Sequence, residues 1–429
     1  MDLFRNAILL ISLFWAFNQE LRVNPLNIYQ QIQRNNDVVW NIIRARRRAR
    51  RRTIFAAAVL LGTSTDNDED RQRRVVRPRQ NIVSLDWWDV TVCQRYTEQL
   101  WKENFRMSQE SFQVLCNILR PTLQREDSNL GNGMSVEKLV GMTLWRLATC
   151  CELRTIGNLF GVHRSTVCRV VQEVCQALVD TMYNNYIVWP TEERLRATIV
   201  GFNELGFPQC AGAIDGSHIP IKAPHFSPAD YYNRKGWYSM ILQGVVDNKL
   251  RFTDVNVGWP GKVHDARVLR NSSIYERGQG GQLFPRNTSL QIDGVDVPVF
   301  IIGDPAYPLM PWLMKAFPER GNFNRRQRVF NYRLSRARMV VERAFGILKG
   351  RWRMLMRRND MHISKVPLIV SSCCVLHNFC IEQNDAIEEA MPDFPIEDEA
   401  NNINVFDNPA PDALDIRTAI TNYCNLHQI

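Results

Sequence analysis

Three acidic residues stand where they could hold a divalent cation. Asp215 interrupts the apolar run Ala211–Lys222, and a buried carboxylate is costly unless a cation or hydrogen bonds compensate it. Asp304 ends a second apolar run, Val297–Gly303, and Glu342 lies in a helical pattern. Carboxylate oxygens suit Mg²⁺ and Mn²⁺. The sequence therefore predicts a metal site built from two strands and a helix.

Such a site is suited to cleaving phosphodiester bonds. Two divalent ions about 4 Å apart can clamp the attacking and the leaving oxygen of the phosphate. Asp215 is fixed by its strand, and Asp304 follows the carboxyl end of a strand, where the sites of α/β sheets collect. Glu342 lies at the edge of the helix face that packs on the sheet. We predict Asp215, Asp304 and Glu342 as catalytic residues, with Mg²⁺ or Mn²⁺ as cofactor.

The elements that must position these residues follow from hydrophobic periodicity. The pattern predicts an α/β fold in which a mixed sheet, beginning with a three-stranded meander, is flanked by helices. The expected strands are Cys210–Lys222, Tyr238–Asp247, Arg251–Trp259 and Val297–Gly303, and the expected helices are His264–Tyr275, Leu309–Phe317, Asn331–Gly350 and Val366–Ile381. Asp247 begins the short hairpin connection between the second and third strands.

An all-α region precedes the sheet, and it contains the order of a helix-turn-helix over about residues 153–174. A short helix through Phe160 is followed by the turn Gly161–His163 and by a helix from Arg164. We expect His163 or Ser165 to cap this second helix. The residues expected to contact DNA are His163, Arg164, Ser165, Thr166 and Arg169, with Arg234 and Lys235 in a later loop. An ordinary helical hairpin with the same turn is the alternative.

The chain divides by composition into four parts. The segment from Pro190 to Phe207 is interpreted as a connection. The tail after Ile381 is acidic and contains several prolines, so we expect it to be poorly ordered. The predicted parts are an apolar segment with arginine-rich arms (1–80), a helical DNA-binding region (81–190), a nuclease domain (205–385) and the acidic tail (386–429).

The charge of the chain favours a polyanionic partner such as DNA. The net charge is +9 and the pI about 9.1. The alternative is a basic protein that has no special partner. Two arginine-rich runs, residues 44–52 and 71–79, suit nuclear import or nucleic-acid binding. The alternative is that each run is a solvated, disordered stretch of charge.

Cysteine usage and the N-terminus favour an intracellular protein. The 11 cysteines include no CxxC pair with a second half, which predicts a reducing compartment. The apolar run Ala7–Phe17 is too short to span a bilayer; we interpret it as a packed helix, with a signal-peptide core as the alternative. No later segment is judged long and apolar enough for a membrane span. We predict nuclear localisation, with the cytoplasm as a second location.

Seven motifs in ordered succession, over about residues 100–385, resemble the PIF/Harbinger transposases and the nucleases derived from them. The motifs are Gly212–Ile219, Asn233–Gly236, Gly258–Gly261, His264–Arg267, Gly303–Tyr307, Arg338–Lys349 and Cys374–Asn378. The resemblance implies a ribonuclease-H-like core with an Asp-Asp-Glu triad. It assigns Asp215 and Glu342 as first and last members, Asp304 as the preferred middle member, and Asp265 as a further acidic position for metal.

The resemblance also implies partners. These are DNA, a separate Myb/SANT-like DNA-binding protein and, because a transposon offers two DNA ends, a homodimer. A strand-transfer step would follow cleavage in a transposase.

Two other functions remain open. One is a domesticated DNA-binding or scaffold protein without turnover, and the other is a metal-dependent phosphohydrolase that acts on another substrate.

Structural alternatives remain for several of these residues. Asp265 could cap a helix or pair with Arg267, and Asp304 could be a turn residue. His218 could be a structural histidine or could touch phosphate or metal-bound water. We expect His377 and its neighbour Asn378 to cap or pack within a helix.

Overall fold

The computed structural model describes residues 87–124, 134–318, 324–385 and 410–426. The apolar run Ala7–Phe17, both arginine-rich runs and most of the acidic tail lie outside these ranges. The chain separates into two units. The larger unit, residues 81–270 and 277–429, holds the sheet, its helices and every predicted catalytic residue. Of the other unit, only residues 271–276 are described.

A five-stranded mixed sheet forms the centre of the larger unit, as the sequence predicts. Its order is β3-β2-β1-β6-β7. β2 runs antiparallel to β1 and to β3, whereas β6 is parallel to β1 and β7. The strands are β1 Cys210–Pro220, β2 Ser239–Val246, β3 Phe252–Pro260, β6 Phe300–Gly303 and β7 Leu313–Met314; β4 Leu290–Ile292 and β5 Val295–Val297 form a separate pair.

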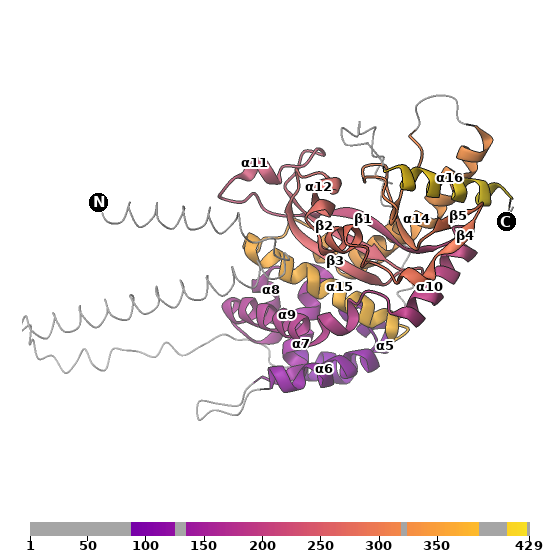
Figure 1. Ribbon diagram of the computed structural model, residues 1–429. Helices are drawn as coiled ribbons and strands as arrows, with labels where there is room; N and C mark the ends of the chain where they lie inside the picture. The colour runs from indigo at the N-terminus through magenta and orange to yellow at the C-terminus, as the bar shows by residue number, and fades with distance from the viewer. Residues whose placement is uncertain (1–86, 125–133, 319–323, 386–409, 427–429) are drawn as a thin grey trace, which may run out of the picture. The chain divides into compact units, whose positions relative to one another are not determined.

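Helices cover this sheet, and all eight residues of β2 are buried beneath them. α14 (Arg325–Arg351) packs against β1, β2 and β6, and α10 (Glu192–Glu204) packs against β1. α15 (Val366–Glu382) packs against β3 on one side and against α9 on the other, so that it lies between the sheet and the helical region (Figure 1).

The helical region shares its hydrophobic core with the sheet. One continuous cluster of buried side chains includes Trp101 and Val171 of the helical region together with Cys373 and Phe345 from the helices on the sheet. The Ser372 hydroxyl of α15 donates to the Cys175 carbonyl at 3.1 Å. The helices of this region are η1 Trp87–Val92, α4 Cys93–Arg95, α5 Glu98–Phe105, α6 Gln109–Leu123, α7 Val136–Thr149, α8 Leu153–Phe160 and α9 Arg164–Tyr186.

α15 also shows where hydropathy alone misleads. Residues Ile363–Glu382 are long and apolar enough for a membrane span by length and composition, so the expectation that no later segment has these properties is wrong. In the structure, 72% of the scored window is buried inside the protein. A helix that is apolar all round suits a position between two packed layers as well as it suits a membrane.

Three further expectations about local structure are wrong. The proposed connection Pro190–Phe207 contains helix α10. The described residues 309–317 form no helix, and Leu313–Met314 among them form strand β7. The single helix expected at His264–Tyr275 is two short ones, α12 Asp265–Arg270 and α13 Ser273–Gln279. Pro311 disfavours a helix at the residue before it, and Leu313 pairs with Ile301 of β6 instead.

The end of the acidic tail is a helix rather than poorly ordered chain. α16 (Pro411–Leu426) packs beside α14 (Figure 1). Its buried residues Ala413, Ile416, Ile420 and Cys424 recur every three or four positions, which is the pattern of a packed helix. The remaining short elements are α11 Pro228–Tyr231, η2 Arg286–Thr288, η3 Arg353–Leu355 and η4 Ile363–Lys365.

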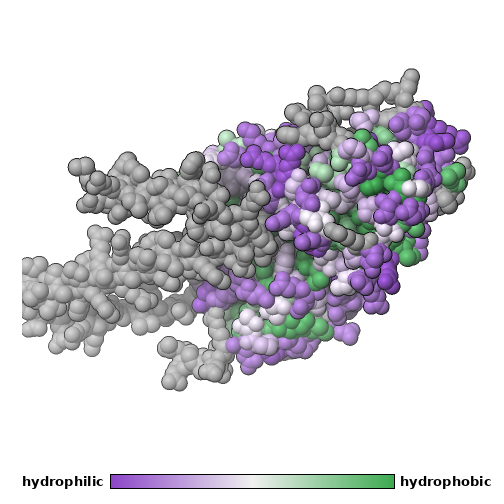
Figure 2. All heavy atoms as spheres, viewed as in Figure 1, coloured by the Kyte–Doolittle hydropathy of each residue, from purple (hydrophilic) through white to green (hydrophobic). Residues whose placement is uncertain are grey.

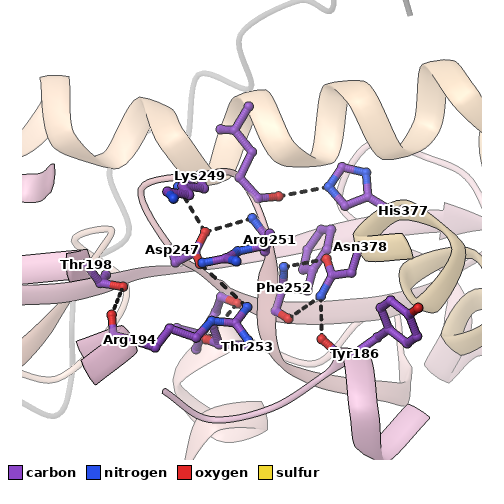
Figure 3. A network of polar contacts seen from close by, with 12 residues as sticks. Tyr186, Arg194, Thr198, Asp247, Lys249, Arg251, Phe252, Thr253, His377 and Asn378 are labelled. Atoms are coloured by element: carbon purple, nitrogen blue, oxygen red, sulfur yellow. Dashed lines mark hydrogen bonds and ion pairs between the residues drawn. The ribbon is translucent and has the colours of Figure 1, made fainter. Parts of the chain in front are cut away.

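A polar cluster closes the β2–β3 hairpin (Figure 3). The buried Asp247 carboxylate accepts hydrogen bonds from the backbone N–H groups of Lys249 and Arg251, each at 2.9 Å, and forms an ion pair with the Arg251 guanidinium at 2.7 Å. Asn378 of α15 accepts from the backbone N–H of Phe252 and donates to the carbonyl of the same residue. We call these residues, together with Arg194 and His377, the hairpin cluster.

His377 and Asn378 are therefore buried packing residues, as expected from the sequence. The His377 Nε2 donates to the Leu250 carbonyl at 2.8 Å (Figure 3). Burial lowers the pKa of His377 to about 4, an effect that the nearby Arg351 charge strengthens and the Leu250 hydrogen bond opposes.

The surface in view is mostly polar, with apolar residues gathered over α10, β4 and α16, where Val200, Leu290 and Leu426 are exposed (Figure 2). An apolar cavity of about 410 Å³ lies near this side and is lined by residues that include Phe284, Val299 and Trp312. None of the predicted catalytic carboxylates lines it.

Candidate active site

β1 and β6 bring Asp215 and Asp304 to neighbouring positions. The two strands are parallel, and Ile214 is paired with Gly303. The next residue along each strand is therefore one of the predicted triad aspartates. Asp215 is half-buried and Asp304 is only 2% exposed. Asp304 also begins a turn, since its carbonyl accepts from the Tyr307 N–H at 3.2 Å.

Asp265 lies against the same part of β1. It is the first residue of α12, and a Cβ added to Gly216 would lie 2.4 Å from the Asp265 Oδ1. Any side chain at position 216 would thus displace the Asp265 carboxylate. The glycine directly after Asp215 allows the two acidic residues to approach each other.

Tyr307 shows that three aspartates converge. Burial, followed by the negative charges of Asp265, Asp304 and Asp215, raises the pKa of Tyr307 well above its ordinary value. Gln243 of β2 donates to the Tyr307 hydroxyl at 3.0 Å and to the Asp265 carbonyl at 3.4 Å. The charges of all three aspartates thus act on one buried phenol, which the Gln243 side chain of β2 contacts.

Glu342 joins this group through Arg338, one helical turn before it on α14. The Arg338 guanidinium donates to the Asp215 Oδ2 at 2.8 Å and forms an ion pair with the Glu342 Oε1. The Asp215, Arg338 and Glu342 side chains are 13%, 23% and 36% exposed. The first and last predicted triad members thus flank one cation at a site open to solvent.

The donor chemistry of this site fits a divalent metal. Asp215, Asp265, Asp304 and Glu342 are hard oxygen donors of the kind that Mg²⁺ and Mn²⁺ take. Within the described ranges, no three His, Cys, Asp or Glu side chains stand close enough together to hold an ion as they are. A positive charge does already lie between Asp215 and Glu342, namely that of Arg338.

Three residues at the site escaped the sequence-based prediction. Arg338 lies in the same motif as Glu342, and Tyr307 lies in the same motif as Asp304. Their spacing from those acidic residues was a usable signal. Gln243 gives no local signal. Only the register of β1 and β2, which pairs it with Gly216, brings it to the site.

The loop between β1 and β2 adds basic residues near the site. Asn233 donates to the Ser239 hydroxyl at 3.0 Å, and its own oxygen accepts from the Lys235 N–H at 3.0 Å. The exposed Arg234 reaches His264, the residue before Asp265, at 2.6 Å. His218 lies 3.0 Å from the same Ser239 hydroxyl, which is a structural contact.

The predicted helix-turn-helix residues form two helices with the expected turn. Gly161 ends α8 with φ of 75°, and His163 caps α9 by accepting from the Ser165 N–H at 3.2 Å. The side chains of His163, Arg164, Ser165 and Arg169 are exposed, whereas Thr166 is half-buried. These observations define the geometry of a helical pair and do not in themselves assign DNA contact.

The family follows from comparison with known proteins. Residues 214–378 match the family described as "DDE superfamily endonuclease", and residues 90–180 match a domain of unknown function. The chain belongs to the Harbinger-derived group of DDE superfamily endonucleases, to which the relatives below also belong. The mixed sheet flanked by helices is consistent with that fold, and divalent metals are general cofactors of this superfamily. No solved structure matches the chain.

The relatives include plant and animal proteins. The chain is 32% identical over 343 residues to the Arabidopsis thaliana protein Antagonist of Like Heterochromatin Protein 1, covering 76% of this chain and 86% of that protein. It is 29% identical over 323 residues to Protein ALP1-like of the same plant, covering 72% and 78%. It is 30% identical over 234 residues to the Homo sapiens protein named "Putative nuclease HARBI1", covering 53% and 62%.

Proposed function

We propose that this protein is a metal-dependent DNA endonuclease of the Harbinger type with the triad Asp215, Asp304 and Glu342. The observation that carries the proposal is pairwise. The register of β1 and β6 sets Asp215 beside Asp304, and Arg338 links Asp215 to Glu342. Its ribonuclease-H-like architecture is part of the proposal and rests on the five-strand order and on the resemblance.

Asp215, Asp304 and Glu342 would hold the catalytic metal, with Asp265 beside them. Bound divalent ions supply Lewis-acid stabilisation of the phosphate and a nucleophilic water at neutral pH. The chain itself fixes the carboxylates. β1 and β6 set Asp215 next to Asp304. Gln243 holds the Tyr307 hydroxyl, and the partly exposed Glu342 lies on the solvent side.

DNA would contact the protein at two places. Arg234 and Lys235 are exposed on the loop that reaches the site, and can donate to phosphate oxygens. The exposed start of α9 offers His163, Arg164, Ser165 and Arg169, with Thr166 behind them. A nuclear location, a Myb/SANT-like partner, a homodimer and a strand-transfer step complete the proposal, and all four derive from the sequence and its resemblance.

Metal binding is the first test. Titration of Mn²⁺ into the full chain by calorimetry should show binding that Asp215→Asn, Asp304→Asn and Glu342→Gln each weaken strongly. Glu204→Gln, an exposed carboxylate on α10, is the matched control and should leave binding unchanged. The Asp265→Asn result decides whether Asp265 is a ligand. Absence of Mn²⁺ binding at millimolar concentration, with and without DNA, would remove the physical basis of the nuclease proposal.

Cleavage is the second test. A supercoiled plasmid should be nicked by the wild-type chain in the presence of Mn²⁺, and not by Asp215→Asn. Equal nicking by both proteins would assign the activity to a contaminant. Metal binding without cleavage of any DNA would support an assembled triad. It would also indicate that cleavage requires a partner protein or a specific DNA end.

A DNA-binding or scaffold protein without turnover is the second candidate. The observation that favours it is Arg338, whose guanidinium pairs with both Asp215 and Glu342 and offsets one of their two negative charges. The relative with the longest match reported above is named as an antagonist of a heterochromatin protein, a name that states no nuclease activity. Salt-dependent DNA binding together with absent Mn²⁺ binding would establish this function instead.

A further inference from the structure

The helix that carries Glu342 has an exposed face of unusual composition. Tyr332 and Met339 are 70% and 51% exposed, and exposed arginines stand between and beyond them. We call this set the arginine stripe, and its members are Arg325, Arg328, Tyr332, Arg336, Met339 and Arg343.

The stripe is a single face of α14. Its members follow each other at spacings of three or four residues, which places them in one row along a helix. From Arg325 to Arg343 the row is about 27 Å long at 1.5 Å per residue. The opposite face is buried and includes Phe330, Leu334, Val341 and Leu348. The exposed row is therefore not needed for packing.

The row runs directly past the candidate site. Arg343 follows Glu342 in the sequence, and Met339 lies one turn before Glu342. Glu342 is the single acidic residue of α14, and it is already paired with Arg338. Like charges three or four residues apart on a helix repel each other, as Arg325 and Arg328 do. No member of the row is acidic, so an anion with spaced charges would stabilise the row.

We propose that the arginine stripe binds the sugar–phosphate backbone of double-stranded DNA beside the bond that is cut, an inference that rests on the proposed nuclease function. About 27 Å corresponds to about 8 base pairs at 3.4 Å per phosphate along one strand. Arginine donates two parallel hydrogen bonds to phosphate. The Tyr332 hydroxyl adds a further donor within the row, and the stripe sets the direction in which the duplex leaves the site.

The experiment measures duplex binding by fluorescence anisotropy, with the full chain and a labelled 30-base-pair duplex in EDTA, over a range of KCl concentrations. The test variant is Arg336→Gln with Arg343→Gln. The control is Arg95→Gln with Arg196→Gln, which removes two exposed arginines from other helices and so changes the net charge equally. The charge-preserving variant is Arg336→Lys with Arg343→Lys.

The test variant should bind about tenfold more weakly near 0.1 M salt, and its log–log salt slope should fall by about 2, because each lost phosphate contact removes about 0.9. The lysine variant should have the same salt slope as wild type. The control variant should match wild type in both duplex affinity and salt slope. Unchanged thermal unfolding and Mn²⁺ binding would show that fold and site are intact. Together these results would support the inference.

Other outcomes overturn it separately from the nuclease function. If wild type binds duplex with a salt-dependent affinity and the test variant equals the control, α14 has only a solvated charged face, and the nuclease proposal stands. Preference of wild type for single-stranded RNA, with loss in the test variant, would refute the duplex assignment. If wild type binds no DNA at any salt concentration, the proposed function itself fails.

Discussion

Two aspartates on the central sheet are each paired with arginine, yet their surroundings differ. Asp247, at the β2–β3 hairpin, is fully buried and accepts from two backbone N–H groups as well as from Arg251 (Figure 3). Asp215, in the middle of β1, is partly exposed and accepts from the Gly216 N–H and from Arg338.

The neighbouring charges differ even more. Around Asp247 stand the cations Arg251 and Arg194. Near Asp215 lie further acidic residues: Asp304 follows the paired strand position, Asp265 lies against Gly216, and Glu342 shares Arg338. A buried carboxylate that backbone donors and cations satisfy stabilises a fold, whereas a group of carboxylates that outnumber their cations, with one member partly exposed, attracts a cation from solution. We call the hairpin cluster closed, because its carboxylate is satisfied by groups of the protein. We call the candidate site open, because its carboxylates can accept a further cation.

The largest effect is expected from Asp247→Ala. The change leaves the Arg251 and Arg194 charges in the protein without the carboxylate, and breaking a buried pair in this way costs about 3–5 kcal/mol. Urea unfolding should show this loss in the free energy of unfolding. Mn²⁺ binding by the folded fraction should be unchanged. A loss below about 1 kcal/mol would contradict the view that the hairpin cluster is closed.

His377 should make the hairpin cluster sensitive to acid. Burial lowers the pKa of His377 in the folded protein to about 4, whereas the unfolded value is about 6.5. As the pH falls below about 6.5, the unfolded chain binds a proton that the folded chain excludes until about pH 4, so stability present at neutral pH is lost in that window. The loss attributable to His377 at pH 5 is about 2 kcal/mol.

The measurement compares wild type with His377→Gln in urea at pH 7.5 and at pH 5.0. Glutamine can still donate to the Leu250 carbonyl but does not titrate. Wild type should lose about 2 kcal/mol more than the variant between the two pH values. Parallel loss in both proteins would show that another group causes the acid sensitivity.

Arg338→Gln is expected to tighten Mn²⁺ binding by about tenfold, or about 1.4 kcal/mol. In the wild type a metal must displace the guanidinium from Asp215 and Glu342, whereas in the variant these carboxylates repel each other until a cation binds. Calorimetry measures the affinity, with Arg336→Gln as the control on the same helix. Weaker binding by Arg338→Gln would show that Arg338 positions the carboxylates instead of competing for them.

The sequence was sufficient for the elements that carry the open site. Apolar runs, with a period-2 pattern in β3, predicted the β1–β3 meander. The acidic residues inside or after such runs made Asp215 and Asp304 candidates. Glu342 followed from its place on a helix edge. These features are local, because each depends on a residue and its near neighbours in the chain.

The contacts that distinguish the two clusters depend on register and packing, which lie beyond local patterns. Gln243 reaches Tyr307 only because β1 and β2 pair Gly216 with Gln243. α16 was missed because the acidic stretch before it dominates the composition of the tail. The hydropathy of α15 is compatible with a core helix and with a membrane helix. Only its packing between two layers of the protein distinguishes the two.

The smallest effect is expected from Asp215→Asn, and it tests the open site most directly. The change removes the charge that pairs with Arg338, but an amide oxygen at position 215 can still accept from the guanidinium, and Arg338 keeps its ion pair with Glu342. It also relieves repulsion among the aspartates around Tyr307. These two contributions oppose each other, so the free energy of unfolding without metal should change by less than about 1 kcal/mol.

Urea unfolding of wild type and Asp215→Asn, each in EDTA and in Mn²⁺, measures this balance. Mn²⁺ should stabilise the wild type by mass action and leave the variant nearly unaffected. A loss of several kcal/mol in EDTA would place Asp215 with Asp247 as a structural carboxylate. If the free energy of unfolding hardly changes in EDTA while the stabilisation by Mn²⁺ is lost, Asp215 is a metal ligand that contributes little to the stability of the fold.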